Sequence, residues 1–139
     1  MREISSGGEL PSVMALAYLG DARHSLFVRR MLVDLGISKS GELNARAQEY
    51  VTAKAQAKAF EKIEPHLTEL EAGVFKRAFN SSHLNKPKRA SGKDYRTATG
   101  FEAVIGMLFW LGDEERLARL LSMTIEPNDN GGNDNDTEN

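Results

Sequence analysis

The sequence predicts an all-α domain, and three observations support this fold class. The run from Lys93 to Gly112 is almost continuously apolar after its first turns, which is typical of a helix covered on most sides. Helix-boundary signals recur along the chain, including the capping box of Thr68 and Glu71 and a left-handed C-terminal cap at Gly36. No segment shows the period-two alternation of a strand. We therefore expect a helical bundle with a buried central helix over 93–112.

The remaining helices follow from their boundary signals. Pro11 is expected to be the first residue of a long N-terminal helix, since the N–H that proline lacks is not needed there. Ser40 is expected to cap a second helix, and Pro65 to stop a third, alanine-rich one. With the capping box at Thr68, these signals place helices over residues 11–35, 42–50, 52–63, 68–79, 93–112 and 114–123.

Composition limits the class of protein. A chain of 139 residues corresponds to one domain, which we place at 10–125, between a flexible lead-in over 1–9 and a disordered acidic tail over 126–139. The absence of cysteine excludes disulfides, thiolate catalysis and cysteine-ligated metals. No run approaches the ~20 apolar residues of a membrane span, and the N-terminus lacks the apolar segment of a signal peptide. We expect a cytoplasmic protein without a membrane partner.

The charge is unevenly distributed. The net charge of −2 includes an acidic tail, whereas residues 1–125 carry 18 basic and 15 acidic side chains, a net charge of +3. Between Asn80 and Arg96 there are five basic residues and one acid. This segment is either a solvated connection or a binding site for an anionic partner, and the carboxylates discussed next favour the second interpretation.

Two carboxylates stand in apolar surroundings, Asp21 in the first helix and Glu102 at the start of the most apolar run. Buried carboxylates need a partner, a proton or a metal. Gly20 adjoins Asp21 and Gly106 lies one turn from Glu102, so both helices have a small residue where a close crossing needs one. A close crossing would bring the two acids together, and hard oxygen ligands in an open site suit Mg²⁺. The reaction class indicated is metal-assisted phosphodiester hydrolysis.

Each acid also has an ordinary interpretation. Asp21 taken alone could be an ion-pair partner of Arg23 or His24 within its own helix. Glu102 taken alone could be an N-terminal acid favoured by the helix dipole.

Several motifs resemble the ribonuclease III family. Leu19-Gly20-Asp21-Ala22 is similar to the core of that family's signature, and the acidic segment that ends in Phe101-Glu102-Ala103 is similar to its second motif. The match is closer to the short Mini-ribonuclease III branch, which lacks a double-stranded-RNA-binding domain. It covers roughly Leu10 to Leu121, and the segments that carry it are 15–22, 83–88 and 91–103.

The resemblance implies an all-α ribonuclease III catalytic-domain fold, a homodimer, dependence on Mg²⁺ and cleavage of double-stranded RNA, with maturation of the 23S ribosomal RNA precursor as its role. By motif position, Asp21 and Glu102 would be the metal-binding catalytic acids, and Asp94 is a further catalytic candidate. Ala17 and Thr99 stand where the full-length family has two more acids, so half of that acidic cluster is missing. The candidate RNA-binding residues are His83, Asn85, Lys86, Lys88, Arg89, Lys93 and Arg96.

A different class of function remains open at this point. A helical RNA-binding or ribosome-assembly module could have kept the fold and lost the chemistry, and the missing acids at positions 17 and 99 are the observation in its favour. A helical nucleotide hydrolase is disfavoured, because Glu114 and Glu115 are too isolated to form the carboxylate pairs that such an enzyme uses.

Overall fold

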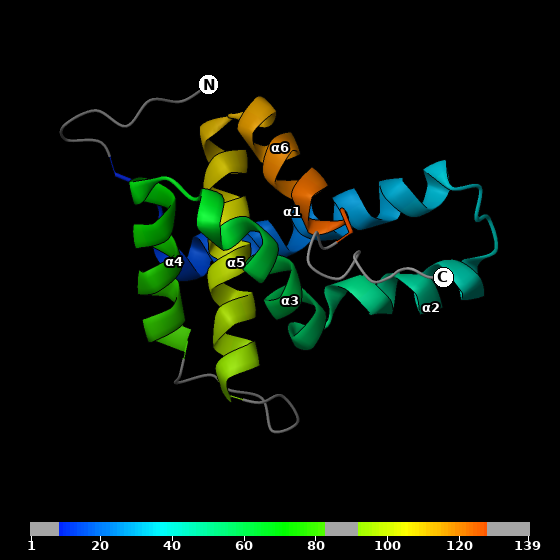
Figure 1. Cartoon of the computed structure of the whole chain (residues 1–139), viewed down its shortest axis with the longest axis horizontal. Helices are drawn as coiled ribbons and strands as arrows, with labels where there is room; N and C mark the ends of the chain where they lie inside the picture. The colour runs from blue at the N-terminus through cyan, green and yellow to red at the C-terminus, as the bar shows by residue number, and fades with distance from the viewer. Residues whose placement is uncertain (1–8, 83–91, 128–139) are drawn as a thin grey trace.

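A computed structural model describes residues 9–82 and 92–127, and these residues form helices without any strand. Figure 1 shows their arrangement. The all-α prediction is confirmed. In chain order the elements are α1 (Val13–Asp34), α2 (Ser40–Val51), α3 (Ala53–Ile63), the short 3₁₀ helix η1 (Glu64–His66), α4 (Glu69–Ser81), α5 (Gly92–Leu111) and α6 (Glu114–Thr124).

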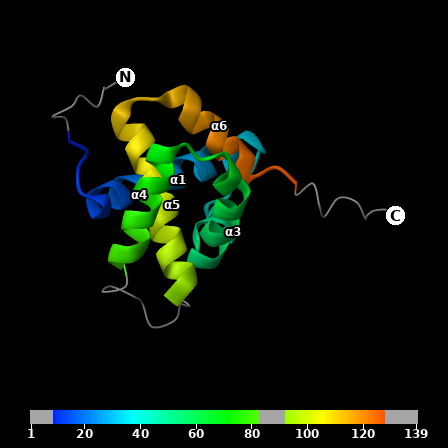
Figure 2. The same ribbon diagram turned by 60° about the vertical axis from the view of Figure 1, so that its left-hand side comes forward.

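Helix α5 is the centre of the bundle, as the sequence predicts. It contacts α1, α3, α4 and α6, and Figure 2 shows it running between α4 and α3. Its buried side chains include Phe101, Val104, Ile105, Met107 and Leu108. Burial on nearly all sides explains why α5 is apolar after its first turns and not amphipathic there.

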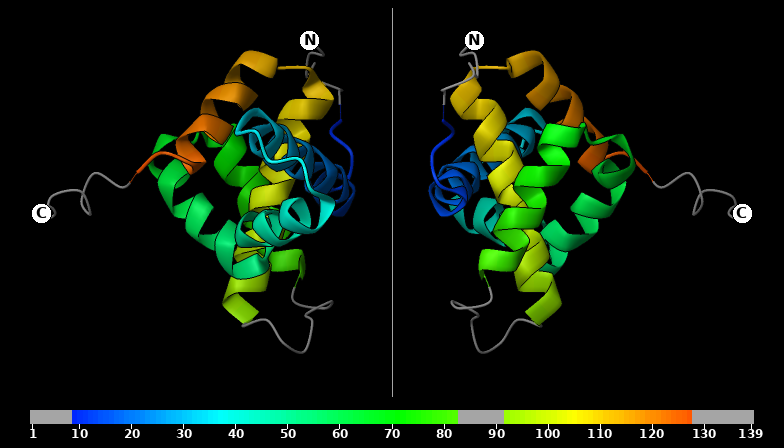
Figure 3. Two further views of the ribbon diagram at one scale, coloured as in Figure 1. Left: turned by 90° about the vertical axis from the view of Figure 1, so that its right-hand side faces the viewer. Right: turned by 90° about the vertical axis from the view of Figure 1, so that its left-hand side faces the viewer.

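Helix α1 crosses α5 steeply, and this crossing organises the molecule. Figure 3 looks almost along α1 while α5 runs up the page. The N-terminal half of α1 packs on α5, whereas its C-terminal half extends beyond the body and is accompanied by α2 (Figure 1). The length of α1 therefore has two reasons: its N-terminal half packs in the core against α5, and its C-terminal half packs against α2 outside the core.

The predicted helix boundaries all lie within two residues of the observed ones, and the caps explain the differences at Pro11 and Ser40. Gly36 has φ 91°, and Thr68 and Glu71 form the predicted capping box. The first helix begins at Val13, two residues later than predicted. Its N-cap is Ser12, whose side chain accepts a hydrogen bond from Ala15 N, so Pro11 lies just before the helix. Ser40 is already helical, and the cap is the extended residue Lys39, whose carbonyl accepts from Leu43 N.

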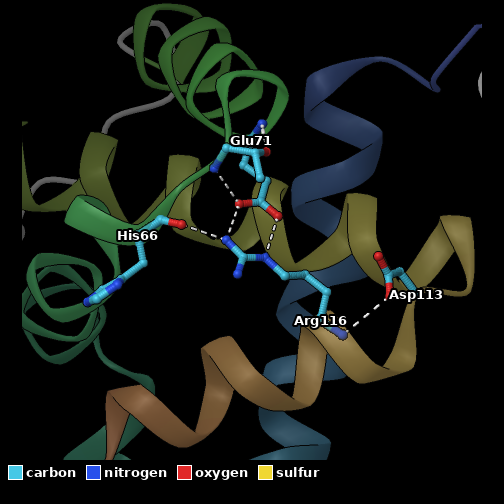
Figure 4. Close-up of polar contacts among 5 residues, drawn as sticks. His66, Glu71, Asp113 and Arg116 are labelled. Atoms are coloured by element: carbon cyan, nitrogen blue, oxygen red, sulfur yellow. Dashed lines mark hydrogen bonds and ion pairs between the residues drawn. The ribbon is translucent and has the colours of Figure 1, made fainter.

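A buried ion pair fastens α6 to α4. Figure 4 shows the guanidinium of Arg116 lying against the carboxylate of Glu71, with Nε and Nη2 donating to the two oxygens at 2.9 and 2.8 Å. Nη2 also donates to the carbonyl of His66 at 2.6 Å. Burial by itself would raise the pKa of Glu71, but the hydrogen bonds and the charge of Arg116, with those of Thr68, hold it below its usual value. Arg116 of α6 thus joins its own helix to η1 and α4.

Several predictions fall outside the described residues. These are the lead-in up to residue 8, the tail from residue 128 and the basic segment over 83–91. The domain limits of 10–125 stay a prediction. None of the described helices is both long enough and apolar enough to span a lipid bilayer.

Candidate active site

The backbones of α1 and α5 touch where Gly20 meets Gly106. A Cβ placed on residue 20 would clash with the carbonyl oxygen of Glu102 and would lie 2.8 Å from Gly106 N. A Cβ placed on residue 106 would clash with the carbonyl of Leu16 and would lie 2.9 Å from Gly20 N. The close crossing predicted from the two glycines is therefore present, and no larger side chain fits at either position.

This crossing brings Asp21 and Glu102 together. Asp21 is exposed, whereas Glu102 is mostly covered by its surroundings. Burial raises the pKa of Glu102 to about 8, and a hydrogen bond to Asp21 and the negative charge of Asp21 add to the shift. Without a cation this raised pKa keeps Glu102 protonated at neutral pH, so that its carboxyl group can donate a hydrogen bond to Asp21. The pair lies at the surface on the Asp21 side and is covered on the Glu102 side.

The donor set fits a hard divalent cation. The carboxyl groups of Asp21 and Glu102 offer oxygen ligands, and a cation that replaced the proton of Glu102 would be held by carboxylate oxygens from both helices. Within residues 9–82 and 92–127 no group of three His, Asp or Glu side chains is placed to hold one metal ion. A cation at this pair would complete its coordination with water and substrate, as Mg²⁺ commonly does.

The other acidic positions do not enlarge the pair. Asp94 is in the first turn of α5, eight residues before Glu102 and so about 12 Å away along the helix axis. It does not join Asp21 and Glu102 in one metal-binding group. Ala17 and Thr99 are both buried, and the hydroxyl of Thr99 donates to the carbonyl of Tyr95 in its own helix.

The ordinary interpretation of Asp21 as an ion-pair partner within α1 is not what the structure shows. Arg23 pairs with Glu114 of α6 at 3.7 Å. His24 is buried at 3% exposure and has its hydrogen-bond partner on α3, where Gln56 Nε2 lies 3.0 Å from His24 Nδ1. Asp21 instead interacts with the carboxyl group of Glu102, although its charge also acts on His24.

Of the predicted RNA-binding residues, five lie outside the described part of the chain: His83, Asn85, Lys86, Lys88 and Arg89. Lys93 is exposed on the first turn of α5. Arg96 has partners within the protein, because its Nε donates to the carbonyl of Phe79 at 3.2 Å and its guanidinium carbon lies 4.3 Å from the centre of the Phe79 ring. Arg96 thus ties the start of α5 to the end of α4, on either side of the basic segment.

Sequence reasoning missed Gln56. It lies on α3 with Phe60 and Ile63, on the face that packs inward, and its side chain is 2% exposed. A polar residue on the apolar face of an amphipathic helix is a detectable signal, because a buried amide must be hydrogen-bonded. Its partners were not detectable in this way, since they lie on α1 and α5.

Comparisons with known proteins agree with the fold. Residues 14–113 match the family described as "Ribonuclease III domain". The chain is 41% identical over 123 residues to the Mini-ribonuclease 3 of Brevibacillus brevis, an alignment that covers 88% of this chain and 92% of the relative. It is 42% identical over 115 residues to the Mini-ribonuclease 3 of Streptococcus pneumoniae, covering 81% and 90%.

A solved structure shows the same architecture. The crystal structure of a Fusobacterium nucleatum protein superposes with a TM-score of 0.75 at 30% identity, covering 90% of this chain and 97% of that one. Sequence and structure comparisons thus span nearly the whole described domain. The chain belongs to the ribonuclease III family, within its Mini-ribonuclease 3 branch, and is an endoribonuclease of the ribonuclease III type.

Proposed function

We propose that the protein is a Mg²⁺-dependent endoribonuclease that cleaves double-stranded RNA at the Asp21–Glu102 pair. The observation that carries the proposal is the contact of two carboxyl groups from α1 and α5 at a crossing that glycines make possible. A module that had lost its chemistry would have no need to keep this costly pair beside solvent. The pair therefore argues against the non-catalytic alternative.

The roles of the two acids follow from their positions. Asp21 and Glu102 would hold Mg²⁺, and the bound cation would polarise a phosphodiester and activate a water molecule. Glu102 would hold the cation as a carboxylate, because the positive charge would offset the burial and the negative charge of Asp21 that raise its pKa. Asp21 is exposed and so faces the side from which a phosphate can approach.

The substrate proposal rests on charge. Lys93 belongs to the basic segment and lies exposed at the start of α5, the helix that carries Glu102. Basic side chains beside a metal site suit a polyanion whose phosphates approach the metal, and an A-form duplex is recognised through its phosphates and 2′-hydroxyls more than its base edges. We propose the 23S ribosomal RNA precursor as the natural duplex, which would place the protein in the cytoplasm.

A homodimer is proposed because α1 has an uncovered apolar stripe. Tyr18, Leu26 and Val33 recur at helical spacing on α1 and are 84%, 59% and 60% exposed. Tyr18 is three residues from Asp21. Pairing along this stripe would cover the apolar side chains and present two carboxylate pairs to one duplex.

The deciding experiment incubates the purified chain with a long perfect RNA duplex and with the matching single strand, each with Mg²⁺ and with EDTA. We expect cutting of the duplex in Mg²⁺ alone. Asp21→Asn and Glu102→Gln are expected to lower the rate by at least about 10³-fold while duplex binding persists. Unchanged cutting by either variant would show that the active site lies elsewhere.

Asp94 is tested in the same assay. It stays a candidate for a supporting catalytic role, and its distance along α5 predicts a smaller loss for Asp94→Asn than for Asp21→Asn. Equal losses would make Asp94 a member of the catalytic group in the RNA complex.

A further inference from the structure

Gln56 is a buried polar side chain that the mechanism above does not use. Its position in α3 is well fixed, because Thr52 caps the helix by accepting a hydrogen bond from Ala55 N at 3.2 Å, and Gln56 N donates to the carbonyl of Thr52 at 2.9 Å. Gln56 therefore lies one turn after a rigid helix start. Because its backbone is fixed there and its side chain is buried, Gln56 has few rotamers available.

The contact with His24 fixes which way the carboxamide points. The amide nitrogen of Gln56 carries two hydrogens and can only donate, so the Nδ1 of His24, 3.0 Å away, must accept. His24 is then the neutral tautomer with its proton on Nε2. Its ring is also held edge-on to Phe101 of α5, with ring centroids 5.0 Å apart. The histidine thus acts as a fixed acceptor, which turns the amide nitrogen, and not the amide oxygen, toward it.

The same carboxamide hydrogen-bonds the side chain of Glu102 and stabilises its ionised form. Only the amide nitrogen can donate, so its two hydrogens serve two acceptors, one on α1 and one on α5. The sequence of contacts is His24, Gln56, Glu102 and Asp21. It runs from the interior of the bundle to the exposed carboxylate.

We propose that Gln56 is a positioning residue for the metal site: its carboxamide, oriented by His24, holds the Glu102 carboxylate toward Asp21 and a bound divalent cation. This inference rests on the proposed function of the Asp21–Glu102 pair. Glu102 has a flexible side chain, and restricting its rotamers before the cation binds reduces the entropy cost of binding. Residues that support metal ligands in this way typically contribute 10–100-fold to affinity or activity.

A neutral donor suits this position better than a charged one. An arginine or lysine beside Glu102 would offset one of the two negative charges that attract the cation. Gln56 gives direction to the carboxylate without adding charge. A protonated His24 could not accept from Gln56, so its burial in a neutral form is part of the same arrangement.

The test replaces Gln56 by methionine, which keeps the length of the side chain and removes the donor. Mn²⁺ binding to the RNA-free protein is measured by electron paramagnetic resonance, well below the unfolding temperature. We expect Gln56→Met to weaken Mn²⁺ binding at least about tenfold and to raise the Mg²⁺ concentration needed for half-maximal cutting by a similar factor. Ile63→Val, a buried change two turns later on α3, is the matched control and should leave both quantities unchanged.

A second variant and a spectroscopic measurement distinguish loss of the Gln56 contact from a general loss of folding stability. His24→Leu leaves Gln56 in place but removes the acceptor that orients it, and should weaken Mn²⁺ binding in the same direction by a smaller factor. In the unaltered protein, ¹⁵N chemical shifts should show His24 with its proton on Nε2 and a hydrogen-bonded Nδ1, and the Nδ1 shift should move in Gln56→Met.

The outcomes separate the inference from the proposed function. Mn²⁺ affinity that is lost in Glu102→Gln but unchanged in Gln56→Met would overturn the positioning role and leave the metal site intact. Equal weakening by Gln56→Met and Ile63→Val would also overturn it, because loosening of α3 would then explain the loss. Mn²⁺ binding that Glu102→Gln and Asp21→Asn do not alter would overturn the metal site itself, and the inference with it.

Discussion

The backbones of Gly20 and Gly106 pack directly against each other, so that a Cβ on either residue would lie within 2.9 Å of the amide nitrogen of the other. These glycines lie beside Asp21 and Glu102, the two acids of the proposed active site. The same close contact between α1 and α5 is therefore needed both to pack the core and to bring Asp21 and Glu102 together.

Gly20→Ala is expected to destabilise the fold strongly. The new methyl group meets backbone atoms, which cannot rotate away, so α1 and α5 must separate at a cost of about 3 kcal/mol or more. Urea denaturation measures the loss. Gly41→Ala is the matched control, because a Cβ there meets nothing within 4 Å, and it should be neutral or slightly stabilising. Similar losses in both variants would contradict the close crossing.

Glu102→Gln should stabilise the metal-free protein at alkaline pH. The pKa of Glu102 is about 8 in the fold against 4.5 in the unfolded chain. The folded state therefore binds more protons in this window, and wild-type stability is full below pH 4.5 and falls by a few kcal/mol as the pH rises to 8. Thermal melting in EDTA at pH 5 to 8 should show this decline in the wild type and a flatter profile in Glu102→Gln.

Added Mg²⁺ provides the companion test at pH 8. A cation that binds the folded state alone should raise the wild-type melting temperature and leave that of Glu102→Gln unchanged. Parallel profiles for the two proteins across the pH range would show that Glu102 does not titrate in this window.

His24 should make the folded state less stable as the pH falls, whereas Glu102 makes it less stable as the pH rises. Burial, countered in part by Asp21 and reinforced by Arg23, lowers its pKa to about 4 from 6.5. The unfolded chain takes up this proton first, so stability is full above pH 6.5 and falls as the pH drops toward 4. Because Glu102 opposes this effect, the comparison belongs in the Glu102→Gln background.

There the free energy of unfolding should fall by about 2 kcal/mol from pH 7 to pH 5. Adding His24→Leu should remove most of that fall. A fall of equal size in both proteins would mean that other groups take up the proton.

Arg116→Met should cost about 3 kcal/mol, because it leaves the carboxylate of Glu71 buried without its partner. Urea denaturation at pH 7 gives the value. Arg30→Met is the control, since the Arg30–Asp34 pair is exposed and a change of less than about 0.5 kcal/mol is expected. If the two substitutions cost the same, the Arg116–Glu71 pair does not fasten α6 to α4 as Figure 4 suggests.

The sequence predicts most of this fold because its helices carry strong local signals. The apolar run of α5, the glycine at position 36 and the capping box at Thr68 each depend on neighbouring residues alone. The errors at Pro11 and Ser40 have the same local origin. Ser12 offers a better cap than the residue before Pro11, and serine is compatible with both a cap and a first helical turn.

The site is predictable only in part. The meeting of Asp21 and Glu102 could be inferred because each acid has a glycine near it in sequence. The contact between Gln56 and His24 joins residues 32 positions apart, and no periodicity encodes such a pairing. Arg96 is a case in which the sequence does not reveal the partner within the protein: it lies in a basic stretch predicted to bind RNA, and its guanidinium stacks on Phe79. Tertiary contacts of this kind require the structure.

The central place of α5 also determines when the enzyme can exist during its own synthesis. Helix α1 is among the first elements to be made, yet the surface that covers it belongs to one of the last. Loop closure over so long a separation is slow and depends on completed partners. A nascent chain that ends before α5 lacks Glu102 and therefore lacks the proposed carboxylate pair. The proposed site is thus completed only after α5 has been made and has packed on α1.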